Sequence, residues 1–312
     1  MKRLYRLGAG IVALSACVNT FANEEASCRT QRIGVIGWTD VVATSAVAGQ
    51  LLKGLGYQTK ESTASQQIIF AGIEKGQVDF LLGYWSPAMD DNIKPFVERG
   101  GVKVLAQPNL ADGVINLAVP RYTAQQGLKT FADIAKFKDQ LGGKIHGIEA
   151  GSGSNAAIQK MIDSNQFDLG DFKLIESSEA AMLAEVGRAI RQEKPVVFLG
   201  WKPHPMNIHY ELSYLTQSEG AMGPNDGMAT VSTVTAPGLA ERCPNVAKLL
   251  ENLVFTSDQE GELMEPIMNR EKPDVVARTW LSKHPQVLEQ WLADVRTADG
   301  HDGLAAVKAY LQ

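Results

Sequence analysis

The chain has 312 residues, of which 45% are hydrophobic and 21% are charged. Such a composition is ordinary for a globular protein, and the length allows one large domain or two of moderate size. A formal net charge of −5 without any basic cluster argues against a nucleic-acid partner. Beyond the N-terminal segment, no apolar run approaches the roughly 18 residues that a membrane-spanning helix needs.

The N-terminus reads as a targeting segment. Basic residues precede the apolar run 7–18, which is too short to span a membrane but typical of a signal peptide. We expect a signal peptide over 1–22, with cleavage after Ala22. An alternative is that Leu14-Ser15-Ala16-Cys17 is a bacterial lipobox, in which Cys17 carries a lipid anchor. Both interpretations predict an exported protein.

Export would affect the oxidation state of the cysteines. After cleavage at Ala22 only Cys28 and Cys243 remain, and an oxidising compartment favours a disulfide between them. The alternative is two buried free thiols. A bond would tie the start of the mature chain to a segment more than two hundred residues later.

The first part of the mature chain alternates between strands and helices. A strand at 32–36 is followed by Gly37, Trp38 and Asp40, and the hydrophobic spacing then predicts a helix over 41–55. The next predicted elements are a strand at 57–62, a helix at 65–75 and strands at 78–83, 102–105 and 115–119. This alternation is typical of a mostly parallel α/β sheet.

The same pattern returns after Pro120. Helices are expected at 131–137, 155–164 and 178–193, and strands at 144–148, 174–175, 196–200 and 229–234. Helices then dominate, at 245–255, 259–269, 272–282 and 285–292. We therefore predict a first lobe formed by 27–117 and 225–312, with a second lobe of 118–224 inserted between them.

Three of the predicted strands end in glycine and then deliver a tryptophan, namely Trp38, Trp85 and Trp201. Ligands of open α/β sheets bind beyond the carboxyl ends of strands, so these indoles are expected to meet at one site. The alternative for each is ordinary core packing. Trp280 and Trp291 lie in amphipathic helices without this context, and we assign them to the core.

Several indoles beside the carboxylate of Asp40 suit a quaternary ammonium group. Its methyl groups prevent strong hydrogen bonding, whereas aromatic faces attract the charge and displace little favourable hydration. Asp40 would add a counter-charge, although it could instead cap the helix that follows it.

No metal or cofactor is predicted. The histidines lack metal-ligand spacing, and His204 is expected to support the turn that holds Trp201. The loop 151–155 follows a strand and opens a helix, but it is neither a Walker loop nor a G-x-G-x-x-G motif.

Together these motifs resemble the periplasmic choline- and glycine betaine-binding proteins of ABC transporters. The matching stretches are 37–40 (Gly-Trp-Thr-Asp), 83–87 (Gly-Tyr-Trp-Ser-Pro), 147–155, 200–207 (beginning Gly-Trp-Lys-Pro-His) and 242–245 (Arg-Cys-Pro-Asn). The resemblance covers nearly the whole mature chain. It implies a two-lobed type II (Venus flytrap) α/β fold with the ligand in a cleft between the lobes, and a disulfide between Cys28 and Cys243.

The resemblance also implies site residues. Trp38, Trp85 and Trp201 would wall an aromatic cage, while Asp40 and Asn155 would contact the charged group and the hydroxyl of the ligand. One departure concerns a fourth wall, which is a tyrosine in choline-binding relatives. Here Ile115, or Val114 with a different gap, takes that place. The loss of one aromatic face brings carnitine and glycine betaine into competition with choline.

The sequence thus predicts a monomeric, non-enzymatic periplasmic protein that presents a quaternary ammonium compound to a membrane permease. One rival is a choline-ester hydrolase that uses Asp40 and His204, but no nucleophile with an adjacent base is apparent. Another is a ligand-sensing protein that acts on a receptor through the same closed form.

Overall fold

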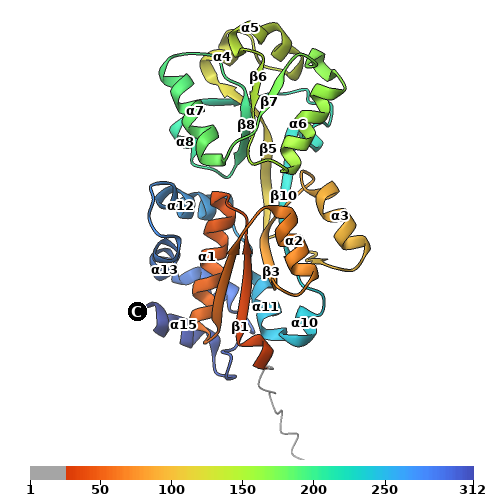
Figure 1. Ribbon diagram of the computed structural model, residues 1–312. Coiled ribbons are helices and arrows are strands. Elements are labelled where there is room, and N and C mark those ends of the chain that lie inside the picture. Colours follow the sequence, from red (N-terminus) through yellow and green to blue (C-terminus); the bar gives the residue numbers. More distant parts are fainter. Residues whose placement is uncertain (1–25) are drawn as a thin grey trace, which may run out of the picture.

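The computed structural model describes residues 26–312, which form two lobes stacked along one axis (Figure 1). This is the two-lobed α/β arrangement expected from the sequence. The predicted signal peptide, its cleavage after Ala22 and the alternative lipid anchor at Cys17 fall outside the described residues. Within 26–312, no helix has both the length and the apolar character needed to cross a membrane.

One ten-stranded sheet runs through both lobes in the order β2-β1-β3-β10-β5-β8-β6-β7, with β4 beside β10 and β9 beside β5. The strands of the first lobe are β1 (Thr30–Val35), β2 (Gln58–Thr63), β3 (Phe80–Ser86), β4 (Lys103–Val104) and β10 (Met228–Thr235). Those of the second lobe are β6 (Lys144–His146), β7 (Lys173–Ile175), β8 (Phe198–Lys202) and β9 (Leu212–Tyr214). β5 (Leu110–Pro120) belongs to both, because its first half pairs with β10 and its second half with β8.

The prediction of a mostly parallel sheet is wrong. β1 runs parallel to β2 and β3, and β6 runs parallel to β7 and β8, as βαβ units require. However, β5 and β10 are antiparallel to every strand with which they pair. The chain must pass from the first lobe to the second and return. β5 and β10 make these two passages, and they run antiparallel to the strands beside them.

Two strands also extend past the glycines at which we expected them to end. Trp85 pairs with Val231 of β10, and Trp201 pairs with Ile115 of β5. The backbone hydrogen bonds to the central strands therefore carry β3 and β8 beyond Gly83 and Gly200. Consequently Trp85 and Trp201 are held inside the sheet at the level where the lobes meet.

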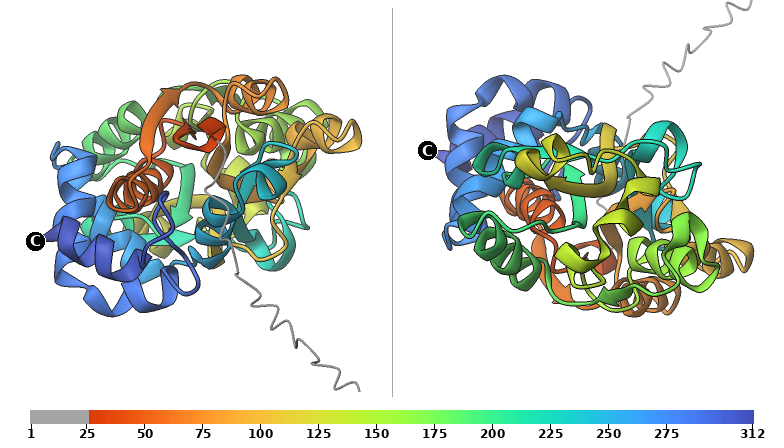
Figure 2. Two further views of the ribbon diagram at one scale, coloured as in Figure 1. Left: turned by 90° about the horizontal axis from the view of Figure 1, so that it is seen from below. Right: turned by 90° about the horizontal axis from the view of Figure 1, so that it is seen from above.

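Helices cover both faces of the sheet in the first lobe. α1 (Thr39–Gly54) is almost wholly buried, and it packs against α12 (Ser257–Met268), α13 (Pro273–Lys283) and α15 (Gly303–Leu311). α2 (Gln66–Glu74) and α3 (Asp90–Glu98) pack together on the opposite side, and the views along the long axis show this separation (Figure 2). The remaining helices of this lobe are α10 (Leu239–Arg242), α11 (Pro244–Asn252) and α14 (Pro285–Trp291).

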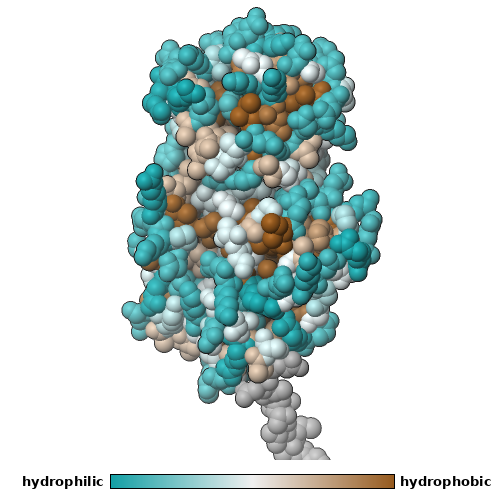
Figure 3. Space-filling model, viewed as in Figure 1, coloured by the Kyte–Doolittle hydropathy of each residue, from teal (hydrophilic) through white to brown (hydrophobic). Residues whose placement is uncertain are grey.

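The second lobe has shorter helices. They are α4 (Arg121–Gln125), α5 (Lys138–Leu141), α6 (Gly153–Asp163), α7 (Glu179–Arg191) and α8 (Met206–His209). Short 3-10 helices lie at Ala26–Cys28, Phe131–Phe137 and Gln166–Asp168, and α9 (Pro224–Gly227) precedes β10 on the return passage. The proposed lobe boundaries, 27–117 with 225–312 and 118–224, fall inside β5 and at α9. Hydrophilic residues cover most of the face shown in Figure 3.

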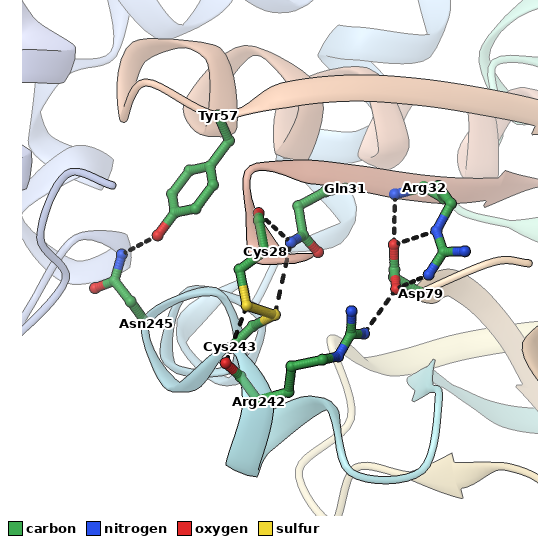
Figure 4. The surroundings of a disulfide bond; sticks show 8 residues. All are labelled: Cys28, Gln31, Arg32, Tyr57, Asp79, Arg242, Cys243 and Asn245. Atoms are coloured by element: carbon green, nitrogen blue, oxygen red, sulfur yellow. Dashed lines mark hydrogen bonds and ion pairs between the residues drawn. A yellow bond between two sulfur atoms is a disulfide. The ribbon is translucent and has the colours of Figure 1, made fainter. Parts of the chain in front are cut away.

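The predicted disulfide is confirmed between Cys28 and Cys243, both of which are fully buried (Figure 4). It joins the segment before β1 to the turn between α10 and α11. Beside it, the buried carboxylate of Asp79 accepts hydrogen bonds from the side chains of Arg32 and Arg242. These contacts fasten the start of the first-lobe chain to the segment that follows β10, away from the cleft.

Candidate ligand-binding site

A small pocket lies where the two lobes meet, and it brings Trp38, Asp40, Trp85 and Trp201 together. Its other lining residues are Ala88, Met89, Ile115, Ile148, Gly153 and Ser154. The cavity that these side chains leave is only about 20 Å³. It is far smaller than the roughly 300–1,000 Å³ of typical small-molecule sites, so the lining side chains lie close together here.

Each indole of the pocket has a fixed partner. Trp85 Nε1 donates to Asp40 Oδ2 at 2.9 Å, and Trp38 Nε1 donates to Glu149 Oε2 at 2.8 Å. The ring of Trp201 meets the ring of His204 edge-on, with 4.7 Å between centroids. Because the N–H groups of Trp38 and Trp85 are already engaged, these two side chains offer a ligand their ring faces.

Asp40 supplies a negative charge with an unused acceptor. Its side chain is buried, and Oδ1 accepts no hydrogen bond from any described residue. Burial raises the pKa of Asp40 to about 6; the hydrogen bond from Trp85 opposes this shift and the nearby charge of Glu179 adds to it. A buried carboxylate of this kind is costly unless a cation compensates it. As for the alternative cap role, the N-cap position of α1 belongs to Trp38, which makes no side-chain cap hydrogen bond, and Asp40 lies in the first turn of the helix.

His204 lies behind the pocket as a support. Its Nδ1 accepts the backbone N–H of Met206 at 3.0 Å, which leaves Nε2 to donate to Glu179 Oε1 at 3.2 Å. Both ring nitrogens are thus occupied. The position matches the predicted support of the Trp201 turn.

The structure does not bring Asn155 into the pocket. Its Oδ1 accepts the N–H of Ile148, and its Nδ2 donates to carbonyl oxygens of Ile148 and Glu149 and to the carboxylate of Glu176. The amide therefore shapes the loop 147–149, and the predicted contact with a ligand hydroxyl gains no support. The pocket wall here is formed by Ile148, Gly153 and Ser154 instead.

Ile115 lines the pocket at the position where relatives were expected to have a fourth aromatic wall. It is paired with Trp201 across β5 and β8. Ile115 also borders a neighbouring cavity of about 690 Å³ between the lobes, which shares Ala88, Gly153 and Ser154 with the pocket. Only a thin layer of side chains therefore separates the pocket from this neighbouring cavity.

Sequence reasoning missed the contacts that hold the two lobes together. Gly153 packs so tightly on the first lobe that an added Cβ would lie 1.7 Å from the carbonyl oxygen of Ala88. Gln67 Nε2 donates across the cleft to the Gly151 carbonyl at 2.7 Å. No motif marks such contacts, because they depend on how the lobes meet. Within the described residues, no group of three or more His, Cys, Asp or Glu side chains could hold a metal ion.

Comparison with known proteins shows the family to which the chain belongs. Residues 30–283 match the family described as the substrate-binding domain of the ABC-type glycine betaine transport system. The chain belongs to this family. It is accordingly a substrate-binding protein of a glycine betaine/choline ABC transporter, and the recognised family and type II fold are confirmed.

Several solved structures resemble most of the chain. An ABC-transporter choline-binding protein in complex with choline has 44% identity and a TM-score of 0.90, covering 93% of this chain and 100% of that one. A choline-binding protein in an unliganded semi-closed conformation has 45% identity and a TM-score of 0.83, covering 91% and 99%. Lactococcal OpuAC, closed around glycine betaine, has 28% identity and a TM-score of 0.77, covering 84% and 99%.

Curated relatives match shorter segments. The uncharacterized protein ORF1 of Chromohalobacter salexigens is 39% identical over 150 residues, which are 48% of this chain and 94% of that protein. The glycine betaine/carnitine transport binding protein GbuC of Listeria monocytogenes is 28% identical over 164 residues, which are 53% of this chain and 54% of GbuC.

Proposed function

We propose that this protein captures a quaternary ammonium compound, such as choline, glycine betaine or carnitine, in the pocket between its lobes and delivers it to an ABC permease. The observation that carries this proposal is the pairing of three indoles with one unpartnered, buried carboxylate oxygen. We further propose that the protein acts as a monomer in the periplasm.

The chemistry of the pocket favours a cation without hydrogen-bond donors. A primary ammonium group would need several acceptors, whereas the only acceptor left open on the carboxylate is Asp40 Oδ1. Each indole face attracts a desolvated cation with about 0.5–2 kcal/mol, so three faces and one counter-charge suffice for a small ligand.

The preference among the three amines depends on Ile115. Choline gains from every aromatic face, and here one face is replaced by an aliphatic side chain that borders a second cavity. Glycine betaine and carnitine both carry a carboxylate but differ in length. The side of the pocket formed by Ile115 should therefore determine the order of their affinities.

Calorimetric titration with choline, glycine betaine and carnitine tests the proposal. Trp201→Ala should weaken binding of the preferred amine at least tenfold, since it removes an aromatic face of about 0.5–2 kcal/mol together with its packing. Trp201→Phe is the matched control and should retain more of the affinity. Undiminished affinity in Trp201→Ala would refute the cage.

The rival hydrolase is not favoured by the geometry. Both ring nitrogens of His204 are engaged, and no serine or cysteine among residues 26–312 is hydrogen-bonded to it. Assay of the purified protein for hydrolysis of choline esters checks this. A sensory role would use the same closed form of the protein. Demonstrated binding to an ABC permease would distinguish transport from sensing.

A further inference from the structure

The N-terminus of α1 has no cap of its own. Several other helices are capped by a side chain at their own N-cap position, namely Ser152 for α6, Ser178 for α7, Thr256 for α12 and Asp302 for α15. In α1 the N-cap residue is Trp38, which offers no acceptor to the free N–H groups of the first turn. The cap comes from the other lobe.

Glu179, the first residue of α7, provides this cap across the cleft. Its Oε2 accepts the backbone N–H of Thr39 at 3.0 Å, and its Oε1 accepts the Thr39 hydroxyl. The same Oε1 also accepts a hydrogen bond from Nε2 of His204, the residue that supports Trp201. Glu179 is only 5% exposed, so this carboxylate is almost fully desolvated between the lobes.

Glu149 makes a second crossing beside it. Its Oε2 accepts the indole N–H of Trp38 at 2.8 Å, while its Oε1 accepts the backbone N–H of Glu179 at 3.1 Å. The carboxylate of Glu149 therefore fixes Trp38, a wall of the pocket. It also fixes the start of α7, the helix that carries Glu179. Neither contact to α1 can exist when the lobes are apart.

Closing the lobes also has an electrostatic cost. Asp40 follows Thr39 directly, and no described residue donates a hydrogen bond to its Oδ1. The charge of Glu179 raises the pKa of Asp40, whereas His204 lowers it. Bringing Glu179 onto Thr39 places two desolvated carboxylates close together, which is unfavourable. A cation in the pocket offsets this repulsion, so the charge of the ligand, and not only its shape, should decide whether the lobes close.

We propose that Glu149 and Glu179 form an inter-lobe latch, which caps α1 and fixes Trp38 only in the closed form, and which a cationic ligand permits by neutralising Asp40. The latch rests on the proposed function, because it assigns the reason for charge selection at the same site. It makes Glu149 and Glu179 positioning residues of the binding reaction.

The test compares choline with its uncharged carbon isostere, 3,3-dimethylbutan-1-ol, by calorimetry on the full chain. Wild-type protein should bind the isostere at least a hundredfold more weakly than choline. Glu179→Gln should bind choline at least tenfold more weakly than wild type, and the ratio of the two affinities should fall at least fivefold. Thr39→Val removes only a neutral donor, so it should weaken both ligands equally and leave the ratio unchanged.

Glu185→Gln is the matched control, because this residue of α7 pairs with Arg188 on the exposed face and should leave both affinities unchanged. Small-angle scattering should show that choline compacts wild-type protein and Glu185→Gln, but compacts Glu149→Gln and Glu179→Gln only at higher concentration. Choline binding that is unaltered in Glu179→Gln, or weakened with an unchanged ratio, would overturn the latch alone. A wild-type protein that binds none of the three amines would overturn the proposed function as well.

Discussion

At the scale of single residues, Asp40 combines deep burial with an open acceptor. Trp85 satisfies one oxygen, and the other has no partner among the described residues. The protein thereby keeps a destabilising charge in a place where a ligand can compensate it. With the proposed function, both binding and stability should depend on the protonation of Asp40.

Binding should therefore weaken in acid. The pKa of Asp40 is raised to about 6, mainly by burial, so at pH 5 about a tenth of the protein carries the charge. If only the charged form binds a cation, affinity at pH 5 should be about tenfold lower than at pH 7.5. Calorimetry across this range checks the slope. Asp40→Asn should bind weakly with a flat profile, and an equally flat wild-type profile would contradict the assignment.

The stability of the unliganded protein should change in the opposite direction. A carboxyl group with a raised pKa binds its proton more tightly in the folded state than in the unfolded state. The contribution of Asp40 to the free energy of unfolding should thus rise as the pH falls from about 6 towards 4. Denaturant unfolding should give a shallower rise in Asp40→Asn over the same range. A rise of equal steepness in both proteins would assign the effect to other groups, such as the buried Glu260.

Ile115 offers a separate test of ligand preference. Ile115→Tyr supplies a fourth aromatic face, and the neighbouring cavity leaves room for the larger ring. A gain of about 0.5–2 kcal/mol corresponds to choline binding twofold to thirtyfold more tightly. Competition titration should show the ratio of choline to carnitine affinity rising, while Ile115→Leu leaves it unchanged. A falling ratio would mean that Ile115 is not the missing wall.

At the scale of secondary-structure elements, the sequence located most helices and strands but not how they pair. The strand–glycine–tryptophan pattern found Trp38, Trp85 and Trp201 because each follows or lies in a strand that ends near the cleft. It misplaced the ends of β3 and β8, since those ends are set by pairing with β10 and β5. The hydrogen bonds of Asn155 go to a loop whose shape the sequence does not reveal, and its predicted contact with a ligand stays a prediction.

The N-terminus of α6 is an element whose position should control closure. Gly153→Ala would place a Cβ 1.7 Å from the Ala88 carbonyl oxygen, which belongs to the other lobe. Each lobe should fold normally while the cleft fails to close, so affinity should fall at least tenfold and the ligand-free melting temperature should stay within about 2 °C. Gly261→Ala in α12, where an added Cβ meets nothing within 4 Å, is the control. Wild-type affinity in Gly153→Ala would show that closure tolerates the methyl group.

At the scale of the whole molecule, stability and binding are placed at opposite ends of the first lobe. The disulfide and the Arg32–Asp79–Arg242 contacts lie near the start of β1 and at α10 and α11, elements that Figure 1 shows at the end of the first lobe away from the second lobe. The pocket lies at the lobe interface. Sequence reasoning found the disulfide because only two cysteines remain after the predicted signal peptide. It could not find the latch, because Glu149 and Glu179 become neighbours of α1 only through the approach of the lobes.

Removal of the disulfide should consequently lower stability and leave affinity intact. The bond closes a loop of 215 residues within the chain, and its loss in the double variant Cys28→Ser/Cys243→Ser should reduce the free energy of unfolding by about 2–5 kcal/mol. Denaturant unfolding measures this loss, and wild-type protein under reducing conditions should reproduce it. Calorimetry at a temperature where both proteins are folded should give the same affinity for the preferred amine within twofold. A tenfold loss there would show that the bond also constrains the lobe interface, and that the two ends of the first lobe are mechanically coupled.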